Sequence, residues 1–130
     1  SGVYQLGNTT LLDAATRFTA GMYLDNYDMC LSFQWQKQLK IGKGGAVLTD
    51  NTDLYDWLLS SRHDGRDYNL WNKWTAQPVF RRTGYHYNMI PEDCALGILL
   101  MDQLPENNGD VCSPAKSYYP DLSKRLKFLN

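Results

Sequence analysis

A single lysine, Lys37, stands in a sequence context that suits covalent chemistry. It follows Ser32 by five residues and precedes the glycine-rich run Gly42-Lys43-Gly44-Gly45. A lysine amine can form a Schiff base with a carbonyl compound when the backbone holds the amine in one place. A serine hydroxyl near glycine backbone N–H groups suits an anion such as a phosphate. Covalent chemistry at Lys37 is one interpretation of this pattern, and the alternative is an ordinary solvated surface lysine.

Two strands must hold this lysine. The apolar run Met29 to Phe33 predicts a buried strand, and Ala46 to Thr49 predicts a second one. Gly44-Gly45 between them is typical of a turn, because glycine reaches positive φ without steric cost. Lys37 is therefore expected in a loop between two strands. Upstream, Asn8 to Leu12 is a short extended candidate that ends at an aspartate.

Two helices are predicted further along the chain. The first covers Thr52 to Ser61, with Thr52 as its N-cap and an apolar stripe at helical spacing, formed by Leu54, Trp57 and Leu58. The second begins at Pro91, which fits the first helical position, and is expected to end near Leu104-Pro105. Its apolar face is expected to consist of Ala95, Leu96, Leu99 and Leu100.

The remaining segments show no steady period. His63 to Arg82 contains Trp71, Trp74 and Pro78 and is interpreted as an irregular excursion that contacts substrate or another subunit. Glu106 to Pro120 is expected to be a loop. Asp121 to Phe128 is predicted as a last helix, whose apolar residues need a surface to pack on.

Composition excludes several classes of protein. The chain has 130 residues, 43% hydrophobic and 13% aromatic, which favours one folded unit. Thirteen basic against 14 acidic residues give a formal charge of −1, so neither nucleic acid nor an anionic membrane is expected as a partner. The longest apolar run, from Ala95 to Met101, is too short to span a bilayer. We therefore expect a soluble, cytoplasmic protein.

The cysteines favour neither disulfides nor a metal site. Cys30, Cys94 and Cys112 are odd in number, and their spacing is unlike that of a metal site. We interpret them as reduced, mostly structural thiols, and expect no bound metal.

Several blocks, in this order, resemble the DegT/DnrJ/EryC1/StrS family of nucleotide-sugar aminotransferases, which use pyridoxal 5'-phosphate. The resemblance covers about Leu12 to Leu104, and it rests on the colinear set and not on any single motif. The blocks are Asp13-Ala14-Ala15, the segment from Ser32 to Lys37, Gly42-Lys43-Gly44-Gly45, Arg62-His63-Asp64-Gly65, Gly84-Tyr85-His86-Tyr87-Asn88-Met89 and Ala95-Leu96-Gly97.

The resemblance implies roles for four residues. Lys37 would bind the cofactor covalently and then act as general base and acid. Asp13 would face the pyridine nitrogen of the cofactor and keep it protonated, whereas its alternative role is to cap a strand end. Ser32 would bind the cofactor phosphate, although it could equally satisfy local backbone groups. His86 would contact the phosphate of a neighbouring subunit's cofactor, and its alternative is packing between two tyrosines.

Three positions depart from the family pattern. Thr16 stands where a Gln or His usually reaches the cofactor, and it is too short to do the same. His86 replaces an asparagine, and Asn88 replaces an arginine. A sister branch of the family, which carries out dehydration, has histidine in place of the lysine, so Lys37 favours transamination.

The resemblance implies an α/β fold, as part of the large domain of an aspartate-aminotransferase-like protein. Residues 1–104 would belong to that domain, and 105–130 would form a linker and the start of a small domain. We expect a fragment or one piece of a split enzyme, completed by a homodimer or another polypeptide. It would transfer an amino group, usually from glutamate, to a keto group of a nucleotide-linked sugar.

Two other interpretations remain open. The chain could be a catalytically inactive, truncated relative that serves as a binding or structural module, with Lys37 retained but idle. It could also be an unrelated soluble α/β domain whose motifs coincide with those of the family.

Overall fold

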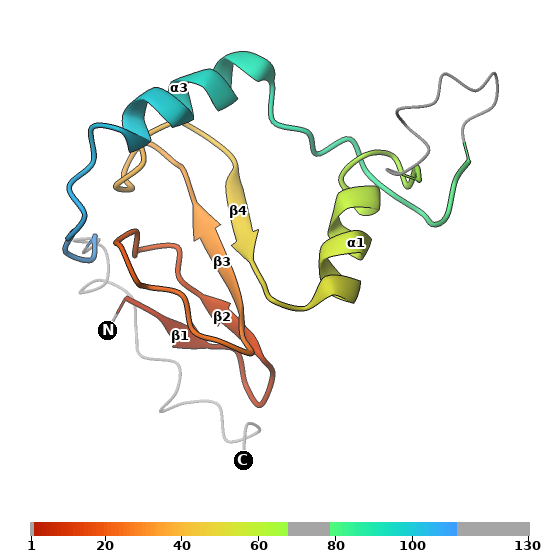
Figure 1. Ribbon diagram of the computed structural model, residues 1–130, viewed down its shortest axis with the longest axis horizontal. Helices are drawn as coiled ribbons and strands as arrows, with labels where there is room; N and C mark the ends of the chain where they lie inside the picture. Colours follow the sequence, from red (N-terminus) through yellow and green to blue (C-terminus); the bar gives the residue numbers. More distant parts are fainter. Residues whose placement is uncertain (1, 68–78, 112–130) are drawn as a thin grey trace, which may run out of the picture.

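Four short strands form one mixed sheet in the order β1-β2-β3-β4 (Figure 1). The computed structural model describes residues 2–67 and 79–111. β1 (Tyr4–Gln5) pairs antiparallel with β2 (Leu11–Asp13), and β2 pairs parallel with β3 (Asp28–Ser32). β4 (Gly45–Leu48) then pairs antiparallel with β3. The order of the strands in the sheet is thus their order in the chain.

The parallel pair β2–β3 requires a crossover, since parallel strands cannot be joined by a tight turn. Residues 14–27 make this connection without a helix, in agreement with the lack of periodicity there. Phe18, Met22 and Tyr23 from the crossover pack against the core. The crossover therefore covers the sheet in the way that a helix does in a regular βαβ unit.

Two of the three predicted strands are confirmed with a shift of one residue, since β3 is Asp28–Ser32 and β4 is Gly45–Leu48. The third prediction, Asn8 to Leu12, is wrong for its first part. Gly7 has a φ of 58°, and the Leu6 N–H donates to the Leu11 carbonyl at 3.0 Å, so residues 7–10 form the turn between β1 and β2. β1 itself, two residues long, carries no periodic signal.

The hydrophobic core lies on one face of the sheet. Leu12 and Met29 are direct neighbours on β2 and β3, and Leu31 lies on the same face. Leu39 and Ile41, from the loop between β3 and β4, are 2% and 6% exposed. The loop that contains Lys37 is therefore anchored in the core.

The first predicted helix is confirmed as α1 (Thr52–Ser61), but its predicted N-cap is wrong. The cap is Asn51, which has an extended backbone and whose side-chain oxygen accepts from the Leu54 N–H at 3.0 Å. Thr52 is already inside the helix. Trp57, predicted on the packed face, is 48% exposed.

The second helix, α3 (Pro91–Met101), begins at the predicted proline and ends at Met101, before the expected Leu104-Pro105. Its predicted apolar face is only partly correct. Leu96 and Leu99 are 39% and 61% exposed, whereas Gly97 is buried against the side chain of Ile41. The helix approaches the core most closely at Gly97, where it has no side chain, and of the four predicted face residues only Leu100 packs against the core.

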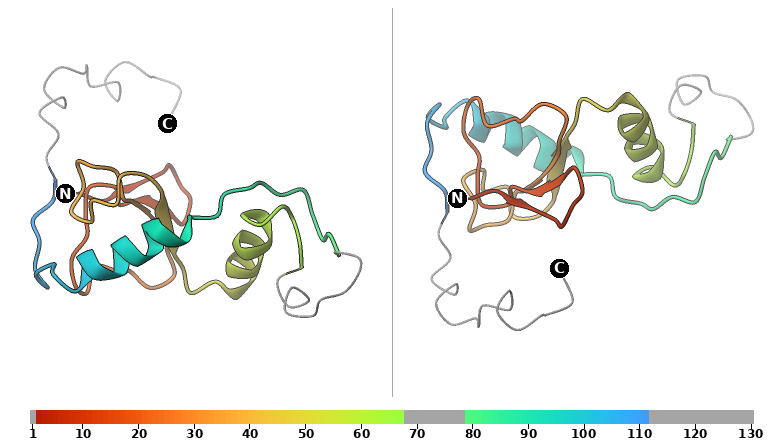
Figure 2. Two further views of the ribbon diagram at one scale, coloured as in Figure 1. Left: turned by 90° about the horizontal axis from the view of Figure 1, so that it is seen from above. Right: turned by 90° about the horizontal axis from the view of Figure 1, so that it is seen from below.

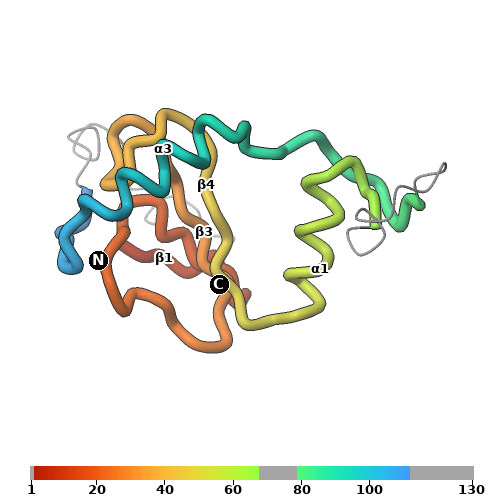
Figure 3. Tube along the Cα trace, turned by 45° about the horizontal axis from the view of Figure 1, so that its top comes forward, coloured from red at the N-terminus to blue at the C-terminus, as the bar shows by residue number. Residues whose placement is uncertain are grey.

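The views in Figures 2 and 3 show α1 to one side of the sheet, whereas α3 lies over the loop that follows β3. Between the helices, the described part of the predicted excursion is irregular, with isolated bridges joining His63 to His86 and Arg66 to Phe80. The other predictions lie outside the described residues, namely those for Trp71, Trp74, Pro78 and the helix Asp121 to Phe128. Within residues 2–67 and 79–111, no helix is long and apolar enough to cross a membrane.

Candidate active site

Asp13 and Ser32 lie at the same edge of the sheet. They are the last residues of β2 and β3, and these strands run parallel. Asp13 is directly opposite Cys30, and Ser32 follows Cys30 by two residues, so the three side chains share one face of the sheet. This is the face opposite to Leu12 and Met29. A carboxylate and a hydroxyl thus meet where two parallel strands end.

Lys37 lies in the loop that leaves β3 at this edge. The loop is closed at its base, because the Phe33 N–H donates to the Gly44 carbonyl at 3.0 Å and the Gly42 N–H to the Phe33 carbonyl at 2.9 Å. At its tip the Lys37 N–H donates to the Gln34 carbonyl at 2.9 Å. Lys37 is half-buried, whereas Lys40 and Lys43 in the same loop are exposed. The predicted position between two strands is confirmed.

The Asp13 side chain accepts a local hydrogen bond. Its Oδ1 accepts from the Ala15 N–H at 2.9 Å, which is the capping contact expected as the alternative. The carboxylate is exposed, and it acts on its neighbour: the pKa of the Cys30 thiol is raised, first by burial and then by the charges of Asp13 and Asp28. Cys30 and Cys94 are both free thiols.

The glycine run shapes the return into β4. Gly44 has a φ of 85°, and a side chain there would collide with the end of Met89. Gly45 is opposite Ser32 in the ladder, and a Cβ there would overlap the Leu31 carbonyl. Gly45 therefore allows β4 to approach β3 closely at the level of Ser32, and Gly44 leaves room for the Met89 side chain.

His86 lies away from the ends of β2 and β3, in the segment that pairs with the turn after α1. In that turn Asp64 has a φ of 57°, and its carboxylate lies 3.5 Å from the His86 ring. The His86 side chain is 80% exposed, and Asn88 contacts the other histidine, His63, at 2.8 Å. The chain thus brings Asp13, Ser32 and Lys37 to one edge of the sheet and leaves His86 beside α1.

A cleft of about 500 Å³ separates the sheet from α1. Residues of β3, β4 and α1 line it, together with Arg62, Tyr87 and Met89. None of the four candidate residues is part of its lining. Among residues 2–67 and 79–111, no group of three or more His, Cys, Asp or Glu side chains is arranged to hold a metal ion.

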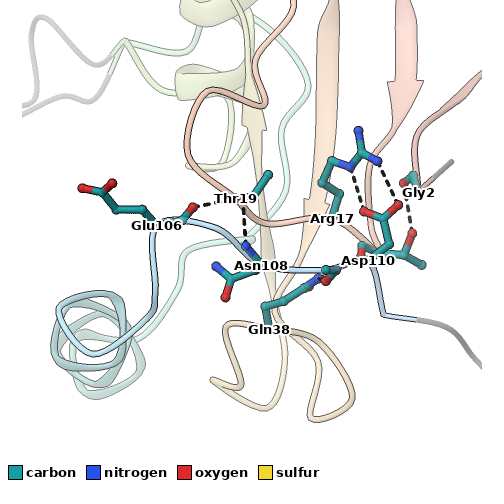
Figure 4. A network of polar contacts seen from close by, with 9 residues as sticks. Gly2, Arg17, Thr19, Gln38, Glu106, Asn108 and Asp110 are labelled. Carbon is teal, nitrogen blue, oxygen red and sulfur yellow. Dashed lines mark hydrogen bonds and ion pairs between the residues drawn. The ribbon is translucent and has the colours of Figure 1, made fainter.

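Sequence reasoning missed a polar network beside Lys37, which Figure 4 shows. Arg17 and Asp110 form a two-pronged ion pair, with Nε–Oδ1 and Nη2–Oδ2 distances of 2.7 and 2.8 Å. The pair lowers the pKa of Asp110 and raises that of Arg17 through these hydrogen bonds. Gln38 donates from its amide to the carbonyls of Thr16 and Gly109. Contacts between residues about 90 positions apart leave no signal in local spacing.

The chain belongs to the DegT/DnrJ/EryC1/StrS aminotransferase family, whose model matches residues 24–126. The match includes Ser32, Lys37 and His86, and Asp13 lies before it. It also extends past Leu104, where the resemblance was expected to end. Neither a curated protein nor a solved structure matches the chain. The family implies the fold of pyridoxal-phosphate-dependent transferases, and the described residues form a small mixed α/β unit with a four-stranded sheet and two helices.

The residues at the sheet edge fit the cofactor that this family in general uses. Pyridoxal phosphate needs an amine for covalent attachment, a carboxylate for its ring nitrogen and donors for its phosphate. Lys37, Asp13 and Ser32 provide one group of each kind, and they come from β2, β3 and the loop that follows β3. The parallel register of β2 and β3 places Asp13 and Ser32 on one face at the strand ends, and the loop that contains Lys37 leaves β3 at the same end.

Proposed function

We propose that this protein takes part in pyridoxal-phosphate-dependent transfer of an amino group from an amino acid, usually glutamate in this family, to a keto group of a nucleotide-linked sugar. The observation that carries the proposal is the common edge at which Asp13 and Ser32 end two parallel strands, with Lys37 on the loop that follows. Membership of an aminotransferase family supports the same reaction class.

Each of these residues has a defined task in the proposal. When bound, pyridoxal phosphate supplies the electron sink for the substrate's Cα–H bond cleavage. Lys37 would hold the cofactor covalently until the substrate amine displaces it, and the freed Lys37 amine would then accept and return the proton. Asp13 places a negative charge beside the ring nitrogen, and the Ser32 hydroxyl donates to the phosphate.

A second polypeptide is part of the proposal. His86 is exposed and lies apart from the other three residues, which supports a role toward the cofactor of a neighbouring subunit. We propose a homodimer or a complementing chain as the source of the missing phosphate ligands, with residues 1–104 as large-domain sequence and 105–130 as a linker and the start of a small domain.

Borohydride trapping tests the proposal. The purified protein is incubated with pyridoxal phosphate, reduced, digested and mapped by mass spectrometry. We expect the label on Lys37 in preference to Lys40 and Lys43. Both of these are more exposed, so unspecific modification would favour them over Lys37. Lys37→Ala should lose the specific label, whereas Lys43→Ala, the matched control, should keep it.

Transamination is measured in the same preparations, with glutamate as donor and a nucleotide-linked keto-sugar as acceptor. Lys37→Ala should abolish turnover with little change in stability, because a half-buried loop lysine contributes little packing. Turnover retained in this variant would remove Lys37 from the mechanism.

A non-catalytic binding module is the second candidate. Two observations favour it: the Asp13 carboxylate is engaged by the Ala15 N–H, and the Thr16 hydroxyl, at a position of cofactor contact in the family, donates to the Gly2 carbonyl at 3.0 Å. The absence of any Lys37 preference in the trapping experiment would support this module.

A further inference from the structure

The residue after Lys37 ties the Lys37 loop to two distant segments. The Gln38 amide nitrogen donates to the Thr16 carbonyl at 3.0 Å and to the Gly109 carbonyl at 2.7 Å. A primary amide has two N–H groups, so each has a carbonyl partner. Thr16 follows Asp13 by three residues, and the Gln38–Thr16 bond therefore joins the lysine loop directly to the turn after Asp13.

One of the two acceptors, Gly109, belongs to residues 106–111, which we call the strap, and the other, Thr16, is hydrogen-bonded to the strap. The Val111 N–H donates to the same Thr16 carbonyl at 2.8 Å, and Asp110 is paired with Arg17. At the other end of the strap, the Ala20 N–H donates to the Glu106 carbonyl at 2.7 Å. The strap thus lies along the start of the crossover from β2 to β3, and Gln38 reaches both.

Besides Gln38, the tip of the lysine loop is restrained by the bridge between Gln34 and Gly42 and by the Trp35 ring, which lies against Gly42. Phe33 on one side and Leu39 on the other are buried, but Gln34, Trp35 and Gln36 between them are exposed. Within residues 34–38, the Lys37 N–H donates to the Gln34 carbonyl. The side-chain hydrogen bonds of this segment come from Gln38. Its amide therefore restricts the backbone next to the lysine at the point where the core no longer does.

We propose that Gln38 is a positioning residue for Lys37. By holding the loop against the turn after Asp13, it fixes the direction from which the Lys37 amine reaches a ligand at the ends of β2 and β3. This inference rests on the proposed function, and it identifies a residue that acts through its neighbour without touching the cofactor. Correct placement of a reacting group is worth large factors in rate, because the alternative is an entropic search.

The amide is specific for this task. Two carbonyl oxygens require two donors, and a glutamate at this position offers only acceptors at neutral pH. Gln38→Glu has nearly the same shape, but it turns both contacts into repulsions. Gln36→Glu is the matched control, since it introduces the same charge two residues away on an exposed side chain.

The experiment compares the yields of trapped cofactor on Lys37 and Lys43 within the same molecules. We expect Gln38→Glu to lower the Lys37-to-Lys43 ratio roughly fivefold, as the loss of a hydrogen bond implies, and Gln36→Glu to leave it unchanged. If Gln38→Glu lowers only the thermal midpoint and leaves the ratio unchanged, Gln38 is merely structural and the proposal is wrong. An equal drop of the ratio in both variants would show that the added charge causes the change, and this result would also overturn the proposal.

Amide hydrogen exchange of residues 34–40 separates this inference from the proposed function, because it needs no cofactor. Gln38→Glu should speed exchange in this segment, and Gln36→Glu should not. The protein without substitutions could show no preference for trapping the cofactor on Lys37 while exchange responds as expected. In that case the proposed function fails, but the restraint of the loop by Gln38 remains. Unchanged exchange in Gln38→Glu would show that the Gln38 hydrogen bonds do not restrain the loop, whichever lysine carries the trapped cofactor.

Discussion

Two regions of this chain differ in whether they have a buried apolar core of their own, although both expose large apolar side chains such as Trp35 and Tyr87. The sheet and its loops contain the whole buried core of the described residues, all of it between Leu12 and Ile41. The region of α1 and residues 79–90 instead exposes large apolar side chains, namely Tyr55, Trp57, Val79, Phe80, Tyr85, Tyr87 and Ile90. Candidate site residues occur in both regions. Only in the first region are their strands and loop held in place by the buried core.

This difference is consistent with the proposal that a second polypeptide completes the site. Asp13, Ser32 and Lys37 belong to strands and a loop that are anchored in the core. His86 lies between Tyr85 and Tyr87, whose rings stack at 5.1 Å on the exposed side. Aromatic residues are enriched where protein surfaces meet, so a neighbouring subunit is expected to cover the second region.

The largest expected effect is on stability. Leu39→Ala should lower the free energy of unfolding by about 2–5 kcal/mol, because Leu39 anchors the lysine loop in the core and is fully buried. Tyr87→Ala should cost about 1 kcal/mol or less, mainly the lost ring stacking, since Tyr87 is 72% exposed. Urea denaturation measures both. Equal losses would contradict the contrast between the two regions.

The next effect is on turnover. Asp13→Asn should slow amino transfer roughly 100-fold with little loss of cofactor binding, because the ring nitrogen loses its charged neighbour. Asp25→Asn, an exposed carboxylate of the crossover, is the matched control and should leave the rate unchanged. An unchanged rate in Asp13→Asn would leave Asp13 with only its capping contact to Ala15.

Local patterns predicted the elements with the strongest local causes. The bounds of α1 were correct because an apolar spacing and polar start residues coincide within ten residues. β3 and β4 were correct within one residue because apolar runs end at glycines and polar residues. The N-cap was misplaced by one residue, since Asn51 and Thr52 are both good caps and only backbone geometry distinguishes them.

The features that the sequence did not predict depend on tertiary contacts. The packed face of α3 is set by the approach of Ile41 to Gly97, and a helix that is apolar on most sides does not show this in its sequence. In the candidate site, Lys37 was predicted from its flanking motifs. Gln38 was not, because its partners Thr16 and Gly109 are brought to it only by the fold.

A smaller effect tests the register that places Asp13 beside Cys30. The pKa of Cys30 is raised, so less reactive thiolate is present at neutral pH, and Cys30 should be alkylated more slowly than exposed Cys94. Asp13→Asn removes one of the causes and should speed the reaction of Cys30 roughly twofold. Peptide mapping after timed alkylation measures each thiol. The same acceleration in Asp25→Asn would show that the effect is not local.

The smallest expected effect concerns the ion pair that holds the strap. Hydrogen bonds from Arg17 lower the pKa of Asp110 below its ordinary value of 3.8, so the pair stabilises the fold above that pH and loses this contribution as pH falls through the lowered value. Asp110→Asn should therefore lower the thermal midpoint slightly at neutral pH, and the difference should vanish in acid. Both side chains are partly exposed, at 33% and 26%, so added salt should also reduce the difference. Thermal melts from neutral pH into the acid range measure it. A difference that persists in acid would mean that the amide disturbs the strap by its shape, and that charge contributes little to holding the strap near Gln38.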